Sequence, residues 1–197
     1  MKQIILLNGP PRCGKNTIAN AIPYHAIIGF SHHLKRCVHA MHFGAAGWAM
    51  DPDAFDAVKS EPLAMLGGRS WRQEYIRFSE EFVKPVYGND WFGEQFVKAA
   101  MAAPELRVIV PDSGFREEAE RTVCEFGPEN VTLIRIHRDG ATFAGDSRSY
   151  IDLADLGVAC FDIDNNSTVD AAAMAARTLT RGWGFTGEQT PVADALG

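Results

Sequence analysis

The sequence predicts one α/β domain with a five-stranded parallel sheet flanked by helices. Short apolar runs that suit buried strands alternate along the chain with segments whose apolar residues recur at helical spacing. This alternation is typical of parallel strands joined by helices that cover both faces of a sheet. The length of 197 residues also fits a single domain. The five strands are expected at residues 4–7, 26–30, 108–110, 131–136 and 158–161.

Helices are expected between or after these strands, and one of them carries the clearest pattern. Trp71, Tyr75, Phe78 and Phe82 recur at i, i+4, i+7 and i+11, which predicts a helix with one aromatic face. Pro85 is expected to end this helix, because proline cannot donate to the helical hydrogen-bond ladder. The expected helices cover residues 15–22, 31–41, 70–84, 91–102, 116–126 and 167–179.

Local signals mark the ends of some of these elements. Ser31 is expected to cap the second helix, and Ser167 with Asp170 resembles a capping box at the start of the last one. Residues 44–68 are rich in glycine, alanine, proline and aspartate, and we expect a loop with short helices there. We therefore predict a single domain over residues 1–181 and a flexible tail over residues 182–197.

Composition argues against several classes of protein. Hydrophobic residues make up 46% and charged residues 22% of the chain, which suffices for a core without disulfide or metal support. A net charge of −6 argues against a surface that coats nucleic acid. No stretch reaches the roughly 20 apolar residues of a membrane helix, and four scattered cysteines favour a reducing compartment. We expect a cytoplasmic protein, monomeric or homodimeric, that binds neither nucleic acid nor a membrane.

The most specific motif follows the first expected strand. Gly9, Gly14 and Lys15 match the pattern G-x-x-x-x-G-K, between a strand and a helix as the motif requires. Glycines let backbone N–H groups surround phosphate oxygens, and the lysine adds a cation. The plainer alternative is a glycine-rich turn with a surface lysine. We predict a P-loop that binds ATP through Gly9, Pro10, Pro11, Arg12, Cys13, Gly14, Lys15, Asn16 and Thr17.

The motif departs from its usual form at the magnesium position. Asn16 stands where a serine or threonine normally follows the lysine, and the hydroxyl comes one residue later at Thr17. An amide oxygen can still hold Mg²⁺ directly or through water, while Thr17 suits a hydrogen bond to the α-phosphate. Asp112 ends the third expected strand, at the sheet edge where ligands gather. Asn16 and Asp112 are therefore the expected magnesium contacts.

Beyond this loop, the sequence resembles the bacteriophage deoxynucleoside monophosphate kinases. Its Gly-Lys-Asn-Thr is similar to their Gly-Lys-Asp-Thr, and further segments follow in that family's order. These segments are Leu34-Lys35, Phe78 to Glu81 with Lys84, Asp90-Trp91-Phe92, Pro111 to Glu118, Asp146 to Ser149 and Asp164 to Ser167. Gly114 and Lys84 depart from the pattern, because each stands where the family has an arginine.

The resemblance implies a P-loop kinase fold with two additions to the sheet. These are a helical acceptor-binding insertion over about residues 31–92 and a short lid over about residues 137–149. It also implies ATP and Mg²⁺ as cofactors, a nucleotide acceptor, and the host cytoplasm as location if the protein comes from a phage. In this kinase superfamily the lid carries arginines, so Arg138 and Arg148 join Lys15 as the expected catalytic residues.

Several residues are candidates for the acceptor site. Arg69 and Arg72 lie three apart near the start of a helix, and paired guanidinium groups suit a monophosphate. Trp91 could stack on a base, although packing is the commoner use of a tryptophan. The full set is Lys35, Arg69, Arg72, Glu81, Asp90, Trp91, Asp112 and Arg116.

These features together predict transfer of the γ-phosphoryl group of ATP to a (deoxy)nucleoside monophosphate. Two alternatives remain open. The acceptor could be another small molecule, such as a coenzyme precursor or a sugar-like alcohol. The chain could also bind ATP without catalysis, which Asn16 and the missing family arginines would favour.

Overall fold

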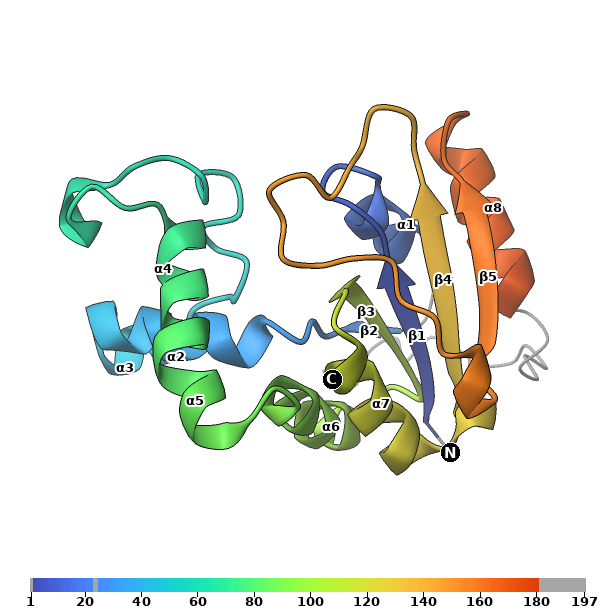
Figure 1. Ribbon diagram of the computed structural model, residues 1–197, viewed down its shortest axis with the longest axis horizontal. Helices are drawn as coiled ribbons and strands as arrows, with labels where there is room; N and C mark the ends of the chain where they lie inside the picture. The colour runs from blue at the N-terminus through green and yellow to red at the C-terminus, as the bar shows by residue number, and fades with distance from the viewer. Residues whose placement is uncertain (1, 23–24, 181–197) are drawn as a thin grey trace, which may run out of the picture.

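The computed structural model describes residues 2–22 and 25–180, so the expected tail at 182–197 lies outside the described residues. Five strands form one parallel sheet in the order β2-β3-β1-β4-β5 (Figure 1). The α/β fold and the five-stranded parallel sheet are therefore confirmed. The strands are β1 (Gln3–Asn8), β2 (Ala26–Ile27), β3 (Arg107–Ser113), β4 (Val131–His137) and β5 (Ala159–Asp164).

Helices cover both faces of this sheet. Side chains alternate along β1, so that Ile4 and Leu6 face one layer while Ile5 and Leu7 face the other. The first layer packs against α2, α4, α6 and α7, and the second against α1 and α8. The α-helices are α1 (Lys15–Ala21), α2 (His32–Phe43), α3 (Ala45–Ala49), α4 (Trp71–Phe78), α5 (Lys84–Tyr87), α6 (Trp91–Ala102), α7 (Arg116–Phe126) and α8 (Val169–Thr180). Short 3₁₀ turns occur at η1 (Ala64–Leu66), η3 (Pro128–Asn130) and η4 (Ala154–Leu156).

The second strand is shorter than expected. It ends at Ile27, although Ile28 still donates a backbone hydrogen bond of 3.0 Å to Ile109. The Asp112 carboxylate then accepts hydrogen bonds from the backbone N–H groups of Phe30, at 2.9 Å, and Ser31, at 3.0 Å. The chain leaves the sheet here because these donors bond to a side chain at the end of β3 instead of a neighbouring strand.

The prediction that Pro85 ends the aromatic helix is wrong. The helix continues through η2 (Ser79–Val83), a turn of π-helix, into α5, where proline occupies the first turn. The π turn changes the hydrogen-bond register just before Pro85, so the N–H that proline lacks interrupts the ladder at one residue without ending the helix. The extra residue of the π turn also rotates the aromatic residues that follow it away from the face that Trp71 occupies. Trp71 is fully buried, whereas Phe82 is 47% exposed.

Two of the expected caps also differ from the prediction. Ser31 precedes α2, but its hydroxyl donates to Asp112 at 2.6 Å instead of capping the helix. At the last helix, the hydroxyl of Thr168 accepts the backbone N–H of Ala171 at 3.2 Å, so the cap lies one residue after Ser167. By contrast Ser70 forms a complete capping box with Gln73.

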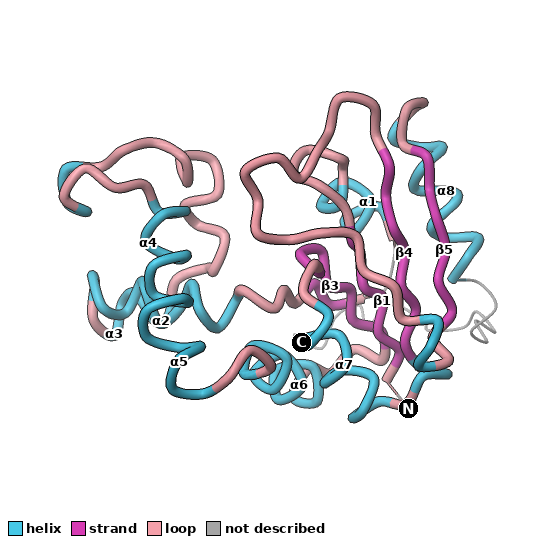
Figure 2. Tube along the Cα trace, in the orientation of Figure 1, coloured by secondary structure: helices cyan, strands magenta, loops and turns pink. Residues whose placement is uncertain are grey.

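The helices from α2 to α5 form a lobe beside the sheet, on the left in Figure 1. We call this group, residues 32–87, the helical lobe. The connection between β4 and β5 runs as a long loop across the end of the sheet nearer α1, drawn in pink in Figure 2. Within the described ranges, no helix has the length and apolar character needed to cross a membrane.

Candidate functional site: the β1–α1 loop and its cavity

The predicted P-loop residues connect the end of β1 to the start of α1. Gly14 stands at the N-cap of α1 with a φ of 101°, in the left-handed region that favours glycine. A side chain there would also collide with the Asn165 amide, since a Cβ would lie 2.3 Å from its nitrogen. Arg12 has a φ of 66°, the one positive φ of a non-glycine residue in the described chain. The loop backbone is thus held in a special conformation at a helix N-terminus, where backbone N–H groups attract anions.

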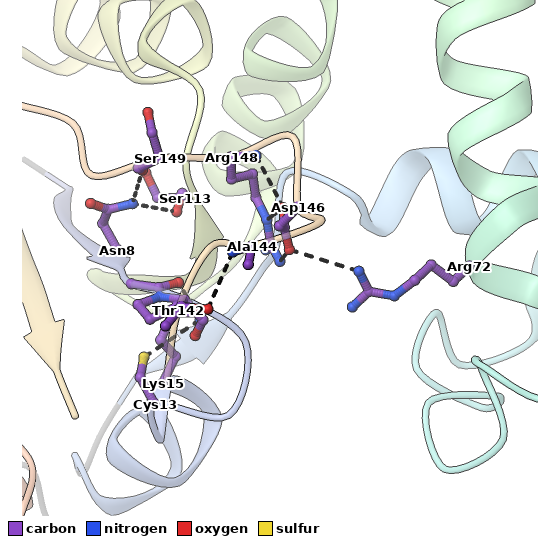
Figure 3. A network of polar contacts seen from close by, with 12 residues as sticks. Asn8, Cys13, Lys15, Arg72, Ser113, Thr142, Ala144, Asp146, Arg148 and Ser149 are labelled. Carbon is purple, nitrogen blue, oxygen red and sulfur yellow. Dashed lines mark hydrogen bonds and ion pairs between the residues drawn. The ribbon is translucent and has the colours of Figure 1, made fainter. Parts of the chain in front are cut away.

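Lys15 folds back over this loop (Figure 3). Its ammonium group donates hydrogen bonds to the carbonyl oxygens of Gly9, at 2.6 Å, and Pro10, at 2.7 Å, and the side chain is 8% exposed. Burial lowers the pKa of Lys15 from its usual value, and the nearby Arg148 lowers it further. The cation therefore sits at the mouth of the loop with only part of its hydration, which strengthens its attraction for a phosphate group.

Two buried asparagines that were not among the predicted site residues hold the loop in place. The Asn8 amide donates to the carbonyl oxygens of Ser113, at 3.0 Å, and Ser149, at 2.9 Å, so it ties the end of β1 to β3 and to the β4–β5 loop. The Asn165 amide donates to the Cys13 carbonyl at 2.7 Å. Both asparagines lie at the carboxyl ends of strands, a position that could have identified them.

A cavity of about 1360 Å³ lies between this loop, the helical lobe and the β4–β5 loop. It exceeds the roughly 300–1000 Å³ of a typical single-ligand pocket. Many of the predicted site residues line it: Pro11, Arg12, Gly14, Lys15, Asn16, Thr17, Lys35, Arg72, Asp112, Arg138 and Arg148.

Gly9, Pro10 and Cys13 of the predicted loop do not line the cavity. Five residues of the predicted acceptor set do not line it either, because their side chains are engaged elsewhere. Arg69 pairs with Glu74 at 2.8 Å and Glu81 with Arg77 at 3.4 Å on the lobe surface. The reason for Arg69 is positional: it precedes the Ser70 N-cap, so helical spacing does not place it beside Arg72.

The remaining three lie near the start of α6 and α7. Asp90 is the N-cap of α6 and borders a separate, smaller cavity. Trp91 packs against the rings of Tyr87, Phe92 and His33. Arg116 pairs with Glu120 and Asp155, each at 2.6 Å.

Lys35 lies on the lobe side of the cavity and is held by two carboxylates. Its ammonium contacts Asp53 and bonds to Asp56 at 3.1 Å, and His32 lies 3.6 Å from Asp53. Burial alone would lower the pKa of Lys35, but the two aspartates raise it overall. The charge of this predicted acceptor residue is therefore already neutralised, and this wall of the cavity is rich in carboxylates.

Two carboxyl groups lie on the sheet side of the cavity, the half-buried Asp112 and the buried Glu118. Burial alone would raise the pKa of Asp112, but His32 and the hydrogen bonds from Ser31 keep it low. Glu118, in the first turn of α7, is 4% exposed, and among the described residues no cation lies within ion-pair distance of it. Burial, together with the charge on Asp112, raises its pKa well above the usual value. Sequence reasoning missed Glu118, although it ends the segment from Pro111 to Glu118.

The β4–β5 loop brings Arg148 into the cavity with a carboxylate partner. Asp146 accepts from the Arg148 side chain at Nε, 2.9 Å, and at Nη2, 2.7 Å. These bonds lower the pKa of Asp146 to about 2. Arg138, at the other end of the loop, is exposed at the cavity rim.

The described residues contain no cluster of three or more histidine, cysteine or acidic side chains suited to a metal ion. The expected magnesium contacts stay predictions. Asn16 is exposed on the cavity wall, so its amide oxygen is accessible to a hydrated ion. Both oxygens of Asp112 accept hydrogen bonds from residues 30 and 31, which fits a contact through water better than direct ligation.

No protein-family model and no curated protein matches the chain. Among solved structures, an unliganded sugar kinase from Janibacter sp. HTCC2649 is similar, with 14% sequence identity and a TM-score of 0.42. The match covers 90% of this chain and 94% of that one.

Proposed function

We propose that this protein is an ATP-dependent kinase that transfers the γ-phosphoryl group to a (deoxy)nucleoside monophosphate. The observation that carries the proposal is Lys15, which is buried at the N-terminus of α1 and opens onto a cavity large enough for two ligands. The helical lobe forms the opposite wall of that cavity. A phosphoryl donor at the loop would thus face an acceptor held by the lobe.

The donor side would use the loop backbone and its cations. The N–H groups of residues 9–17 would surround the phosphates, with Lys15 against the β- and γ-phosphoryl oxygens. Arg12 and Arg138 line the same part of the cavity and would hold the outer charges of the triphosphate. Asn16 and, through water, Asp112 would hold Mg²⁺, which supplies charge neutralisation between the β- and γ-phosphates.

Phosphoryl transfer needs positioning and positive charge more than covalent chemistry. Lys15 and Arg148 lie close enough for the charge of one to lower the pKa of the other. Lys15 would therefore stabilise the negative charge on the migrating group, and Arg148 would add positive charge to it from the acceptor side. No basic or nucleophilic side chain is required, since the acceptor phosphate supplies the attacking oxygen.

A second candidate acceptor is a hydroxyl compound. The specific observation in its favour is the pairing of Lys35 with Asp53 and Asp56, because carboxylates on a cavity wall suit hydroxyl donors. In that case Asp112 would be the group to accept the hydroxyl proton.

A coupled assay of ADP release, screened over all ribo- and deoxynucleoside monophosphates and a set of sugars and polyols, tests the proposal. We expect turnover that depends on a monophosphate and that Lys15→Ala abolishes, while the exposed lysine variant Lys98→Ala leaves it unchanged. Turnover with a polyol alone would favour the second candidate. Binding of ATP without transfer to any acceptor would leave a non-catalytic nucleotide-binding protein.

A further inference from the structure

Asp146 bridges two arginines that come from different parts of the fold (Figure 3). Its carboxylate accepts two side-chain hydrogen bonds from Arg148 in the β4–β5 loop. On its other side it lies 3.7 Å from the Nη1 atom of Arg72, at the start of α4 in the helical lobe. All three side chains line the cavity. One carboxylate therefore joins the lobe to the sheet.

The two guanidinium groups converge where a phosphate would fit. A carboxylate that accepts two parallel N–H bonds from an arginine occupies the geometry that a phosphate adopts with the same group. The Asp146 side chain is 5% exposed, so it fills the space between the arginines. A single negative charge faces two cations there, whereas a phosphate dianion would balance both.

Gly114 makes room for Arg148 at this position. A Cβ added to Gly114 would lie 2.7 Å from the Cβ, Cγ and Cδ atoms of Arg148. Real Cβ atoms do not approach other carbons so closely, so a side chain at residue 114 would push the arginine stem aside. The absence of a side chain at this residue is thus a condition for the observed placement of the guanidinium group.

We propose that Arg72 and Arg148 form the subsite for the phosphate of the acceptor, and that Asp146 occupies this subsite until the phosphate displaces it. The inference rests on the proposed function and names the acceptor class as phosphate-bearing. A neutral polyol would not compete with Asp146 for the two arginines. Asp146 therefore contributes to specificity. Only an anion that bonds to both guanidinium groups gains enough binding free energy to replace it.

Displacement requires a local change in the loop. Asp146 follows Gly145, whose φ of 74° favours glycine, and a backbone hydrogen bond of 2.9 Å joins its N–H to Phe143. The surrounding residues form neither helix nor strand. A rotation of the Asp146 side chain would break its two bonds to the Arg148 guanidinium group and a third, of 3.0 Å, to the Arg148 backbone N–H. All three lie within the loop, so the sheet would not be disturbed.

Isothermal titration with inorganic phosphate and with an equimolar mixture of deoxynucleoside monophosphates, at fixed ionic strength, tests the subsite. We expect Asp146→Asn to bind both probes about fivefold tighter or more, because the competing charge is removed. The matched control is Asp162→Asn, which breaks a similar two-bond pair with Arg135, at 3.0 and 2.8 Å, outside the cavity. Equal affinities for the two variants, or no measurable binding by either, would overturn the proposal.

Two further variants keep the test decisive if Asp146→Asn folds poorly by circular dichroism. Arg72→Gln removes one cation from a side chain that is 37% exposed, and we expect about tenfold weaker phosphate binding. Gly114→Ala leaves every charge in place but displaces Arg148, and we expect a similar loss. Unchanged affinity in either variant would contradict the subsite.

The outcomes for the subsite and for the kinase reaction are separable. Binding of an ATP analogue, lost in Lys15→Ala, reports on the donor loop alone. Tighter phosphate binding in Asp146→Asn without phosphoryl transfer would support the subsite and reject the kinase. Phosphoryl transfer to a monophosphate, with no effect of Asp146→Asn on phosphate affinity, would support the kinase and reject the subsite.

Discussion

The two ends of the cavity differ in how their cations are balanced. At the donor end, formed by residues 9–17 and Arg138, neither Arg12 nor Arg138 has an ion-pair partner among the described residues. At the acceptor end, formed by the cavity-facing residues of the helical lobe, each cation has a carboxylate partner: Lys35 with Asp53 and Asp56, Lys59 with Asp56, Arg72 with Asp146, and Lys84 with Glu80.

Because of this difference in ion pairing, the two ends of one cavity should bind anionic ligands with different selectivity. Unpaired cations attract a highly charged ligand with little need for specific geometry. Paired cations resist such a ligand unless it can replace the carboxylates they already hold. We therefore expect the donor end to contribute affinity and the acceptor end to contribute selectivity.

The largest expected effect is the loss of kcat when the buried cation of the donor end, Lys15, is removed. Lys15→Ala should lower kcat by about 100-fold or more, since it removes the buried cation beside the migrating group. Steady-state kinetics with saturating acceptor would measure this loss. Lys98→Ala, on the exposed face of α6, serves as the control and should retain wild-type turnover. A Lys15→Ala variant with unimpaired turnover would remove the basis of the kinase proposal.

The next largest expected effect is on the free energy of unfolding. It compares the buried carboxylate of Asp146, paired with Arg148, with the exposed carboxylate of Asp162, paired with Arg135. Asp146 has a pKa lowered from 3.8 to about 2, so it stabilises the fold at pH values above 3.8. That stabilisation is lost as pH falls from about 4 to 2. Asp146→Asn should therefore reduce the free energy of unfolding by about 2 kcal/mol at pH 7 and by much less at pH 2.

Urea denaturation at several pH values would measure this difference. Asp162 is 50% exposed, so Asp162→Asn should cost less than Asp146→Asn at pH 7. Equal losses in the two variants would show that the burial of Asp146 adds nothing to the strength of its pair.

A smaller kinetic effect would sharpen the contrast at the donor end. Arg138→Gln should lower kcat/KM for ATP about tenfold, the loss expected for one charge-assisted hydrogen bond. The KM for the acceptor should stay unchanged, because Arg138 lies at the rim beside the loop and away from the lobe. An effect confined to the KM for the acceptor would contradict the assignment of Arg138 to the donor end of the cavity.

The smallest expected effect is on the buried carboxyl group of α7. The pKa of Glu118 is raised, so the folded protein binds a proton more tightly than the unfolded chain. Stability should therefore fall as pH rises above about 4.5, toward the raised pKa of the folded state. Glu118→Gln should abolish this fall and gain on the order of 1 kcal/mol at neutral pH. A variant less stable than wild type at pH 7 would indicate that Glu118 is ionised in the fold.

Local patterns were sufficient for most of the fold. The apolar runs placed all five strands, and helical spacing placed α6 and α7 at the bounds the structure gives. These elements were predictable because their burial patterns follow the backbone period alone. The helix through Pro85 was not, because a π turn depends on how the chain packs around it.

The candidate site, like the fold, has a part that was predictable from the sequence and a part that was not. The sequence alone determined the loop at residues 9–17, because its glycines, its lysine and the flanking strand and helix are adjacent in the chain. It could not determine which cations meet which carboxylates. Arg72 faces Asp146 across 74 residues, while Arg69 turns to Glu74 five residues away. Only the tertiary structure decides such pairings, since they depend on the placement of the helical lobe against the β4–β5 loop.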